Sequence, residues 1–366
     1  MKEKFIPKSF YLQWHITERC NWRCKHCYQE SYKTPEMSLE QLYGVLDQYL
    51  ALIKKWNIPK SRARMSLTGG EPLIRSDFFS LLARMHKFGN FFNYTILSNG
   101  SLIDKEIIKK LKFLGVNNFQ VSLEGMEKNN DEIRGKGSFL KVINSIKLLL
   151  DNKILNIRVS LSLNKKNAGD VEKLADFLTP IAKGKGNITL AARRMVPWGS
   201  ASEMKEFIQE PLELKNFYES VERINKRMTE KKCNVRVVGG CENGIFNGLV
   251  SNNLMSISHC GIVDGRLIIV MPNGDVLPCR RLPIKAGNVL KQSLEEIYYS
   301  DFMEKLRSKN NKHKQCKNCD NYQNCFGGAP CVTYAYTGKI NIPDVQCWRA
   351  YDNLEEVRNN KYSEEL

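Results

Sequence analysis

The sequence predicts an α/β fold, a partial (βα)6 TIM-like barrel followed by a C-terminal cysteine-rich domain. From residue 10 to about residue 205, short β-rich runs alternate with longer segments of helical periodicity, which is typical of βαβ units and a parallel sheet. Six such units suit a partial barrel better than a closed barrel of eight. Beyond residue 232 the composition changes, and nine of the twelve cysteines occur there.

The expected strands are short runs separated by turn residues or by helical patterns. We predict strands at Phe10–Thr17, Arg62–Leu67, Asn93–Leu97, Asn118–Leu123, Ile157–Leu163 and Ile188–Ala192. Apolar residues at helical spacing predict helices at Leu39–Trp56, Phe78–Phe88, Lys105–Leu114, Leu140–Leu150 and Val171–Leu178. In parallel α/β folds the chemistry collects in loops at the carboxyl ends of the strands, so we expect the functional site there.

Three segments divide the chain. Residues 1–205 form the predicted barrel, residues 206–255 a bridging segment, and residues 256–366 the cysteine-rich domain. The bridging segment is expected to hold a helix near Leu212–Thr229 and the glycine-rich stretch Val238–Gly248. In the last segment, Pro272-Asn273-Gly274-Asp275 predicts the turn of a hairpin between Leu267–Met271 and Val276–Leu277, and a helix is expected near Leu294–Arg307.

The formal net charge of +17 raises the possibility of a nucleic-acid partner. The basic residues are dispersed through helical segments such as Lys105–Lys112, which is typical of a solvated surface, so no nucleic acid is expected. Attraction of an acidic peptide segment stays open. Neither an N-terminal apolar run of signal-peptide length nor a run of about 18 apolar residues occurs, so we expect a cytoplasmic protein that does not enter a membrane.

The cysteines are unevenly distributed. Three fall within residues 20–27, none occurs in residues 28–232, and nine lie in residues 233–347. A disulfide framework is not expected in a cytoplasmic chain, because the thiol pool keeps such pairs reduced. Metal or cluster ligation is therefore the better interpretation.

The string CNWRCKHC follows the first predicted strand and places Cys20, Cys24 and Cys27 in one short loop. Three thiolates on a [4Fe-4S] cluster leave one iron without a protein ligand, and that iron can bind a chelating molecule. From this spacing alone a zinc site is the alternative, because thiolates also suit zinc.

Gly69-Gly70-Glu71-Pro72 follows the second predicted strand. Glycines let the backbone approach a ligand closely. CxxxCxxC followed by GGEP resembles the radical S-adenosylmethionine (SAM) superfamily, over roughly residues 10–200. The resemblance implies that the GGEP motif holds the methionine amino group of SAM, with Glu71 assisting through its charge. It also places His26, before the third cysteine, near the adenine; otherwise His26 packs against or caps the loop.

Polar residues at the ends of later strands match positions where members of this family contact the carboxylate and ribose of SAM. These residues are Ser98, Asn99, Ser122, Glu124 and Ser162, and Arg134 is a candidate partner of the same carboxylate. As the alternative, serine and asparagine occur routinely in strand-end turns, and an arginine is commonly a surface residue. The loop Arg193–Gly199 is expected to overhang the barrel mouth, where its arginines could meet substrate.

The C-terminal cysteines resemble those of the SPASM domain of radical SAM maturases, which carries two auxiliary iron–sulfur clusters. The resemblance assigns Cys241, Cys260, Cys279 and Cys331 to the nearer cluster. It assigns Cys316, Cys319, Cys325 and Cys347 to the outer one. Five residues separate Cys325 from Cys331 where three are usual, and some relatives lack a ligand equivalent to Cys241. Taken alone, the spacing from Cys316 to Cys331 also fits a zinc ribbon. Cys233 fits no position and is expected to be a buried thiol.

The resemblance implies an oxidoreductase with SAM and three [4Fe-4S] clusters, which cleaves SAM reductively to a 5′-deoxyadenosyl radical and abstracts hydrogen from a substrate. Maturation of a ribosomally made peptide is the expected role, by thioether or carbon–carbon crosslinking or by side-chain oxidation. A flavodoxin or ferredoxin is the expected reductant. Because the first strand begins near residue 10, leader binding is expected to use the core, the bridging segment or a separate protein.

Three alternatives stay open. The first is tailoring of a small cofactor or haem precursor. The second is sulfatase maturation, which is disfavoured because relatives with that role carry an acidic residue after the cysteine equivalent to Cys279, where this chain has Arg280. The third is a non-enzymatic iron–sulfur or zinc protein, against which the GGEP motif argues.

Overall fold

The computed structural model describes residues 4–29, 31–240, 260–307 and 316–355. Its core is one curved, ten-stranded sheet with the strand order β10-β9-β8-β1-β2-β3-β4-β5-β6-β7. The strands from β1 to β7 are parallel: β1 (Phe10–Thr17), β2 (Ala63–Gly69), β3 (Asn93–Leu97), β4 (Asn118–Ser122), β5 (Asn156–Leu163), β6 (Asn187–Arg194) and β7 (Val235–Gly239). This arrangement confirms the predicted α/β fold with a partial parallel barrel.

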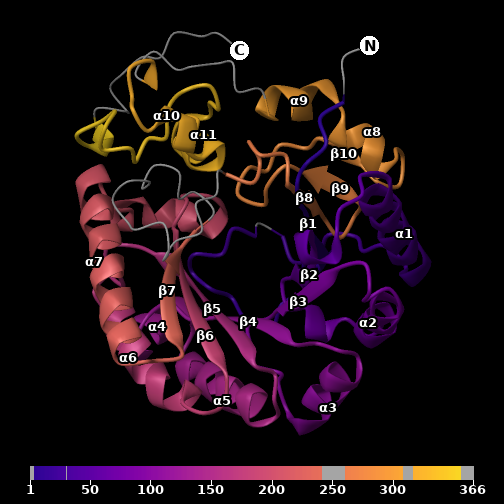
Figure 1. Cartoon of the computed structure of the whole chain (residues 1–366), viewed down its shortest axis with the longest axis horizontal. Coiled ribbons are helices and arrows are strands. Elements are labelled where there is room, and N and C mark those ends of the chain that lie inside the picture. Colours follow the sequence, from indigo (N-terminus) through magenta and orange to yellow (C-terminus); the bar gives the residue numbers. More distant parts are fainter. Residues whose placement is uncertain (1–3, 30, 241–259, 308–315, 356–366) are drawn as a thin grey trace.

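Helices cover the outer, convex side of the sheet (Figure 1). They are α1 (Leu39–Lys55), α2 (Phe78–Lys87), α3 (Lys105–Phe113), α4 (Glu127–Arg134), α5 (Ser138–Asp151), α6 (Asp170–Ala182) and α7 (Pro211–Glu230), with 3-10 turns η1 (Lys60–Arg62), η2 (Pro72–Ile74) and η3 (Gly199–Phe207). The start of α1 shows why a helix begins there, because Ser38 and Gln41 cap each other's backbone amides.

Strand β5 shows how alternation builds both the core and the inner wall. Ile157, Val159, Leu161 and Leu163 are buried among the helices. The intervening Ser160 and Ser162 face the interior of the barrel, where they line a cavity. Strand β5 thus contributes one face to packing and the other to the site.

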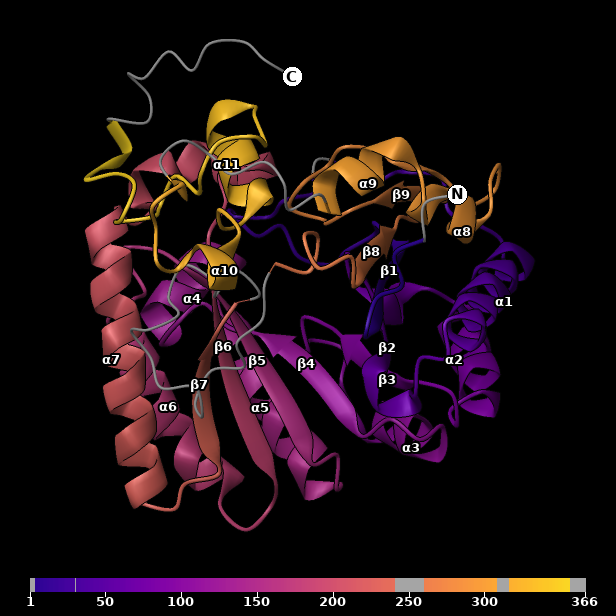
Figure 2. The same ribbon diagram turned by 45° about the horizontal axis from the view of Figure 1, so that its top comes forward.

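The C-terminal region continues the same sheet. Strand β8 (Leu267–Val270) runs parallel to β1, and β9 (Asp275–Leu277) and β10 (Gly287–Asn288) follow in antiparallel order. Figure 2 shows β8 and β9 beside β1. Of the short helices, α8 (Leu294–Tyr298) packs on α1, and α9 (Asp301–Arg307) follows it. Helices α10 (Tyr322–Cys325) and α11 (Pro330–Thr337) lie on the side of α7 (Figure 1).

Several elements differ from the prediction. Strand β7 lies in the segment predicted to bridge the two domains, and α4, α10 and α11 were not expected. The predicted helix Leu294–Arg307 is divided into α8 and α9 at Tyr299 and Ser300. The Ser300 amide donates to the Ile297 carbonyl at 3.2 Å, and the Ser300 carbonyl then accepts from the amide of Glu304 as α9 begins. The stretch Val238–Gly248 lies largely outside the described residues. In the described part of the chain, no helix is long and apolar enough to cross a membrane.

Candidate active site

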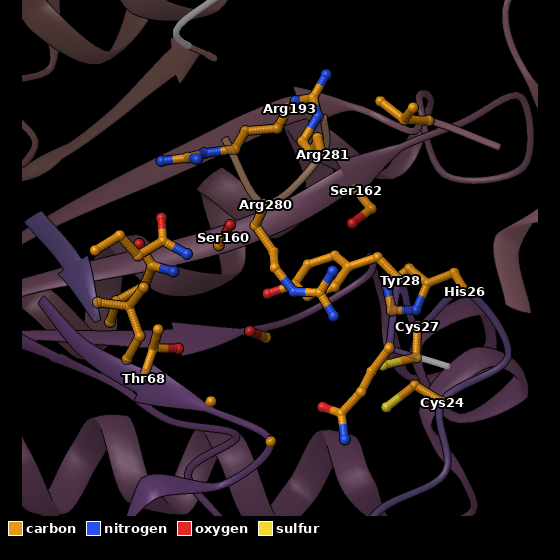
Figure 3. A pocket seen from close by; sticks show the side chains of 18 of the residues that line it. Cys24, His26, Cys27, Tyr28, Thr68, Ser160, Ser162, Arg193, Arg280 and Arg281 are labelled. Carbon is orange, nitrogen blue, oxygen red and sulfur yellow. The ribbon is translucent and has the colours of Figure 1, made fainter. Parts of the chain in front are cut away.

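A cavity of about 310 Å³ lies inside the curve of the sheet. Its wall combines the loop after β1 (residues 18–29, the cysteine loop), the carboxyl ends of β2 to β6, and residues 279–281 after β9. The structure brings together these predicted site residues on its wall: Cys20, Cys24, His26, Cys27, Gly69, Gly70, Ser98, Asn99, Ser122, Glu124, Arg134, Ser162 and Cys279. Figure 3 shows Cys24, Cys27 and His26 on one side of the cavity and Thr68 on the other.

The three thiols of the cysteine loop suit an iron–sulfur cluster in their donor chemistry. N–H groups point at two of the sulfurs: the amide of Trp22 (3.4 Å) and the side chain of Asn99 (3.9 Å) at Cys20, and the Nη1 of Arg134 (3.8 Å) at Cys24. Such N–H contacts to sulfur tune protein-bound clusters. Burial raises the pKa of both thiols, to about 11 for Cys24. Metal ligation requires the thiolate form of each cysteine, so binding of metal here would release protons.

Gly69 and Gly70 are required by the close passage of the cysteine loop. A Cβ on Gly69 would lie 2.1 Å from the carbonyl oxygen of Thr17, and one on Gly70 would lie 2.3 Å from that of Arg19. The amide of Gly70 also donates to the carbonyl of Thr17 at 2.9 Å. The glycine pair therefore fastens the base of the cysteine loop to β2, in addition to lining the cavity.

Glu71 is fully buried and, like Pro72, is not part of the cavity wall among the residues described. Its carboxylate accepts hydrogen bonds from the Ser98 hydroxyl at 2.9 Å, the Asn99 amide at 2.7 Å and the Leu73 amide at 3.2 Å. Burial raises the pKa of Glu71 to about 7, although these bonds oppose the rise. Glu71 is thus a positioning residue for the loop after β3.

Glu124 is the central carboxylate of the site. It is fully buried and accepts hydrogen bonds from Arg134 Nε at 3.0 Å and from the Ser162 amide at 2.7 Å. Nε2 of His26 lies 2.9 Å from Glu124 Oε1, without the alignment of a hydrogen bond. Burial opposes ionisation of Glu124, but the charges of His26 and Arg134 outweigh it and hold the pKa at about 2.

The contacts of Glu124 join the cysteine loop to α4 and to β5. Arg134 ends α4 and reaches both Glu124 and the Cys24 sulfur, while the carbonyl of Ile133 accepts from the amide of Lys25. His26 and Arg134 therefore both contact Glu124 in this structure. Their contacts with the adenine and carboxylate of SAM stay predictions.

The four thiols assigned to the outer auxiliary cluster lie together. Cys316, Cys319, Cys325 and Cys347 line one small cavity of about 20 Å³. Burial raises the pKa of Cys316 to about 12, and the neighbouring thiols are a second, smaller cause of the rise. Thiolates are soft ligands whose donor chemistry suits a cluster or a zinc ion. Among the described residues, however, no group of three His, Cys, Asp or Glu side chains is arranged to hold a single metal ion.

The nearer auxiliary set is seen in part. Cys260, Cys279 and Cys331 are all buried and belong to one apolar cluster, and Cys279 also lines the main cavity. Cys241 lies outside the described residues. Cys233 is only half buried, so its prediction as a buried thiol was wrong; it follows the end of α7 and precedes β7, at the edge of the sheet.

Sequence reasoning missed several residues of the cavity wall. Tyr28, Ser160, Arg266 and Arg281 line it, and so does Arg280, which was noted only as a mark against sulfatase maturation. Ser160 could have been identified from the alternation of apolar and polar residues along β5. The arginines depend on how the β8–β9 hairpin docks beside β1, which no local pattern encodes.

Comparison with known proteins agrees with this geometry. The chain matches the sequence profile of the radical SAM superfamily over residues 14–178 and that of the SPASM iron–sulfur cluster-binding domain over residues 260–320. It is 25% identical over 349 residues to the AdoMet-dependent heme synthase of Methanosarcina barkeri, covering 92% of this chain and 95% of that protein. It is 26% identical over 358 residues to the mycofactocin maturase MftC of Mycolicibacterium smegmatis, covering 94% and 84%.

The fold is also that of a solved structure. Streptococcus suis SuiB bound to its precursor peptide SuiA superposes with a TM-score of 0.70 at 18% identity, covering 93% of this chain and 76% of SuiB. The cysteine loop, the glycine pair and the C-terminal cysteines fall within or beside the matched segments. The chain is therefore an enzyme of the radical SAM superfamily with a C-terminal SPASM domain.

Proposed function

We propose that this enzyme matures a ribosomally synthesised peptide by abstracting a hydrogen atom from it, leading to a thioether or carbon–carbon crosslink or to side-chain oxidation. The observation that carries the proposal is the shared cavity. Residues of the cysteine loop and Cys279 of the SPASM domain line the same space inside the barrel. A substrate bound there would be within reach of both parts of the chain.

When bound, SAM and the reduced cluster supply a 5′-deoxyadenosyl radical, as the superfamily resemblance implies. The chain holds the two groups and excludes water from them. Cys20, Cys24 and Cys27 are the proposed cluster ligands. Gly69, Gly70, Ser98 and Asn99 are the proposed holders of the methionine end of SAM, and Ser122, Glu124, Arg134 and Ser162 of its carboxylate and ribose, with His26 near the adenine.

The proposal includes two auxiliary [4Fe-4S] clusters. The nearer is held by Cys241, Cys260, Cys279 and Cys331, and the outer by Cys316, Cys319, Cys325 and Cys347. The gathering of the outer set around one cavity supports this assignment. Three clusters correspond to about 12 iron atoms per chain.

Relatives support a peptide substrate. SuiB binds the precursor peptide SuiA, and MftC is a maturase. Within the proposal, a flavodoxin or ferredoxin is the reductant and the cytoplasm is the compartment.

A second candidate is the tailoring of a haem precursor. It is favoured by the similarity to an AdoMet-dependent heme synthase, whose length this chain matches almost completely. Both candidates need the same cavity and the same cofactors.

The test is direct. The anaerobically reconstituted enzyme is incubated with SAM, a reductant and short peptides encoded beside its gene, or with an iron coproporphyrin, and the products are read by mass spectrometry. We expect loss of hydrogen, in pairs, from one peptide. Modification of the porphyrin alone would replace the first candidate with the second, and SAM-dependent modification of neither class would contradict both.

A further inference from the structure

The positive charge on the cavity wall is not balanced by the described residues that line it. Six arginines line the cavity, whereas Glu124 is the single carboxylate among the described lining residues. Glu124 is engaged by Arg134, and Arg194 is paired with Asp344 at 2.7 Å. Arg266 lies 3.5 Å from Asp264, which does not line the cavity. The other arginines on the wall are Arg193, Arg280 and Arg281.

Arg280 is buried without a hydrogen-bonded counterion. It is 8% exposed, and its Nη2 lies 3.7 Å from Glu18, beyond hydrogen-bonding distance. Glu18 Oε1 is thus an ion-pair partner of Arg280 without a hydrogen bond, and Glu18 Oε2 accepts a hydrogen bond from Thr34. Nε of Arg280 has no hydrogen-bond partner among the described residues. Burying a guanidinium whose hydrogen bonds are not all made costs free energy, unless an anion accepts the remaining ones.

The neighbouring contacts hold Arg280 close to the cysteine loop. Its guanidinium lies 4.7 Å from the centre of the Tyr28 ring, and Tyr28 directly follows Cys27. Figure 3 shows Arg280 extending past Tyr28 toward the side where Cys24 and Cys27 lie. A cation over an aromatic face is favourable, so the contact fixes the guanidinium in the cavity.

Arg193 adds a second cation from the barrel itself. It lies on β6 in register with Ser162 of β5, and its Nε is also buried without a hydrogen-bond partner in the described part of the chain. Arg193 and Arg281 lie on the same side of the cavity in Figure 3. Two chain segments far apart in sequence thus contribute guanidinium side chains to the wall of one cavity.

We propose that Arg193 and Arg280 bind a carboxylate of the substrate and hold it beside the site of hydrogen abstraction. Guanidinium forks match the planar geometry of a carboxylate and bind it through two hydrogen bonds. The inference rests on the proposed function and narrows it: the reacting part of the substrate carries a carboxylate. An aspartate, a glutamate, a peptide C-terminus and a porphyrin propionate all offer this group.

The test measures binding to the reconstituted enzyme in the presence of SAM. One set of probes is fluorescent hexapeptide pools with one position fixed as Asp or Glu, compared with pools fixed as Asn or Gln, each with a free or an amidated C-terminus. The other is a porphyrin tetracarboxylate, compared with its methyl ester. In one of the two sets, we expect the carboxylate form to bind about ten times more tightly than its uncharged counterpart, or tighter still. The set that shows this preference identifies the source of the carboxylate.

Variants separate this site from general attraction by a basic protein. R193Q with R280Q should abolish the preference for the carboxylate, and R280K should lose most of it because lysine lacks the fork. The matched control R62Q with R223Q removes the same charge from exposed positions and should keep the preference. Arg193 is distant in sequence from the cysteines. If substitutions of Arg280 impair folding, R193Q alone can therefore still be compared with the native protein.

Two results would overturn the proposal. The first is a carboxylate preference that is absent from both probe sets or that survives in R193Q with R280Q. The second is a loss of SAM affinity of about tenfold or more in that variant, since the arginines would then hold the carboxylate of SAM. Failure of the proposed function looks different, because the native enzyme would then modify neither the peptides nor the porphyrin, whether or not it prefers carboxylates in the binding test.

Discussion

Arg194 at the end of β6 forms two hydrogen bonds to Asp344, of 2.8 and 2.7 Å, and both side chains are almost completely buried. The pair joins the barrel to the segment that contains Cys347. Asp344 also accepts a hydrogen bond from the Ala329 amide at 3.0 Å. One carboxylate therefore holds the C-terminal cysteines in place against the sheet.

Replacing Asp344 with asparagine should lower the free energy of unfolding by about 3 to 5 kcal/mol, because it leaves the buried Arg194 charge without a counterion. Chemical denaturation under anaerobic conditions measures this loss. The control D47N changes exposed Asp47, an ion-pair partner of Arg84, and should change stability by less than about 0.5 kcal/mol. Equal effects of the two substitutions would contradict the structural role of the pair.

Gly70→Ala should displace the cysteine loop, because the new Cβ would meet the backbone oxygens of Arg19 and Glu18 at 2.3 and 2.7 Å. We expect the iron content to fall by about four atoms per chain, with the SPASM sites retained. Gly44→Ala is the control, since nothing lies within 4 Å of its Cβ and it lies within α1. Unchanged iron content in the Gly70 variant would refute the fastening role of the glycine pair.

Glu124→Gln should weaken the joint between the cysteine loop, α4 and β5. The native carboxylate is held ionised, with a pKa of about 2 against the usual value of 4.5, by His26 and Arg134, which outweigh the opposing effect of burial. Its contribution to stability is therefore present above pH 4.5 and is lost as the pH falls toward 2. Acid titration followed by circular dichroism should show unfolding at higher pH in E124Q, and coincident curves would argue against it.

Glu71 has the opposite pH dependence. Burial raises its folded pKa to about 7 from an ordinary 4.5, so its contribution to stability is complete below pH 4.5 and is lost as the pH rises through 7. E71Q cannot ionise, so thermal unfolding between pH 5 and pH 8 should be less dependent on pH in the variant than in the wild type. Parallel profiles would show that Glu71 does not titrate in this range.

The outer auxiliary set can be tested separately. Cys316→Ala should remove about four iron atoms per chain and leave the signal of the SAM-binding cluster unchanged, because the two sites lie in different cavities. Electron paramagnetic resonance of the reduced protein, with and without SAM, makes the distinction. Loss of a zinc ion instead of iron would favour the zinc-ribbon interpretation.

Local sequence patterns predicted most of the barrel. The bounds of β1 and β3 agree with the prediction, since period-two alternation and flanking turn residues mark both strands. Strand β7 was missed because Val235–Gly239 is short and runs into a glycine-rich stretch. The parallel pairing of Tyr11 with Leu267 joins residues more than 250 positions apart, which local patterns cannot reveal.

The parts of the site that are formed by short sequence motifs were predicted from the sequence. The cysteine loop, the glycine pair and the outer cysteine set are compact in sequence, and the structure brings the members of each together. The shielding of Glu71 behind the cavity wall and the central place of Glu124 depend on hydrogen bonds between separate loops. The entry of Arg280 into the cavity depends on the docking of a hairpin from the SPASM domain.

The proposed role of the cysteine loop is to hold a cluster that cleaves SAM. The most direct measurement is the yield of 5′-deoxyadenosine and methionine from the anaerobically reconstituted, reduced protein, compared with its Cys24→Ala variant. We predict that both products form with the native protein and that neither forms with the variant. A native protein that binds zinc at Cys20, Cys24 and Cys27 and leaves SAM intact would contradict the account.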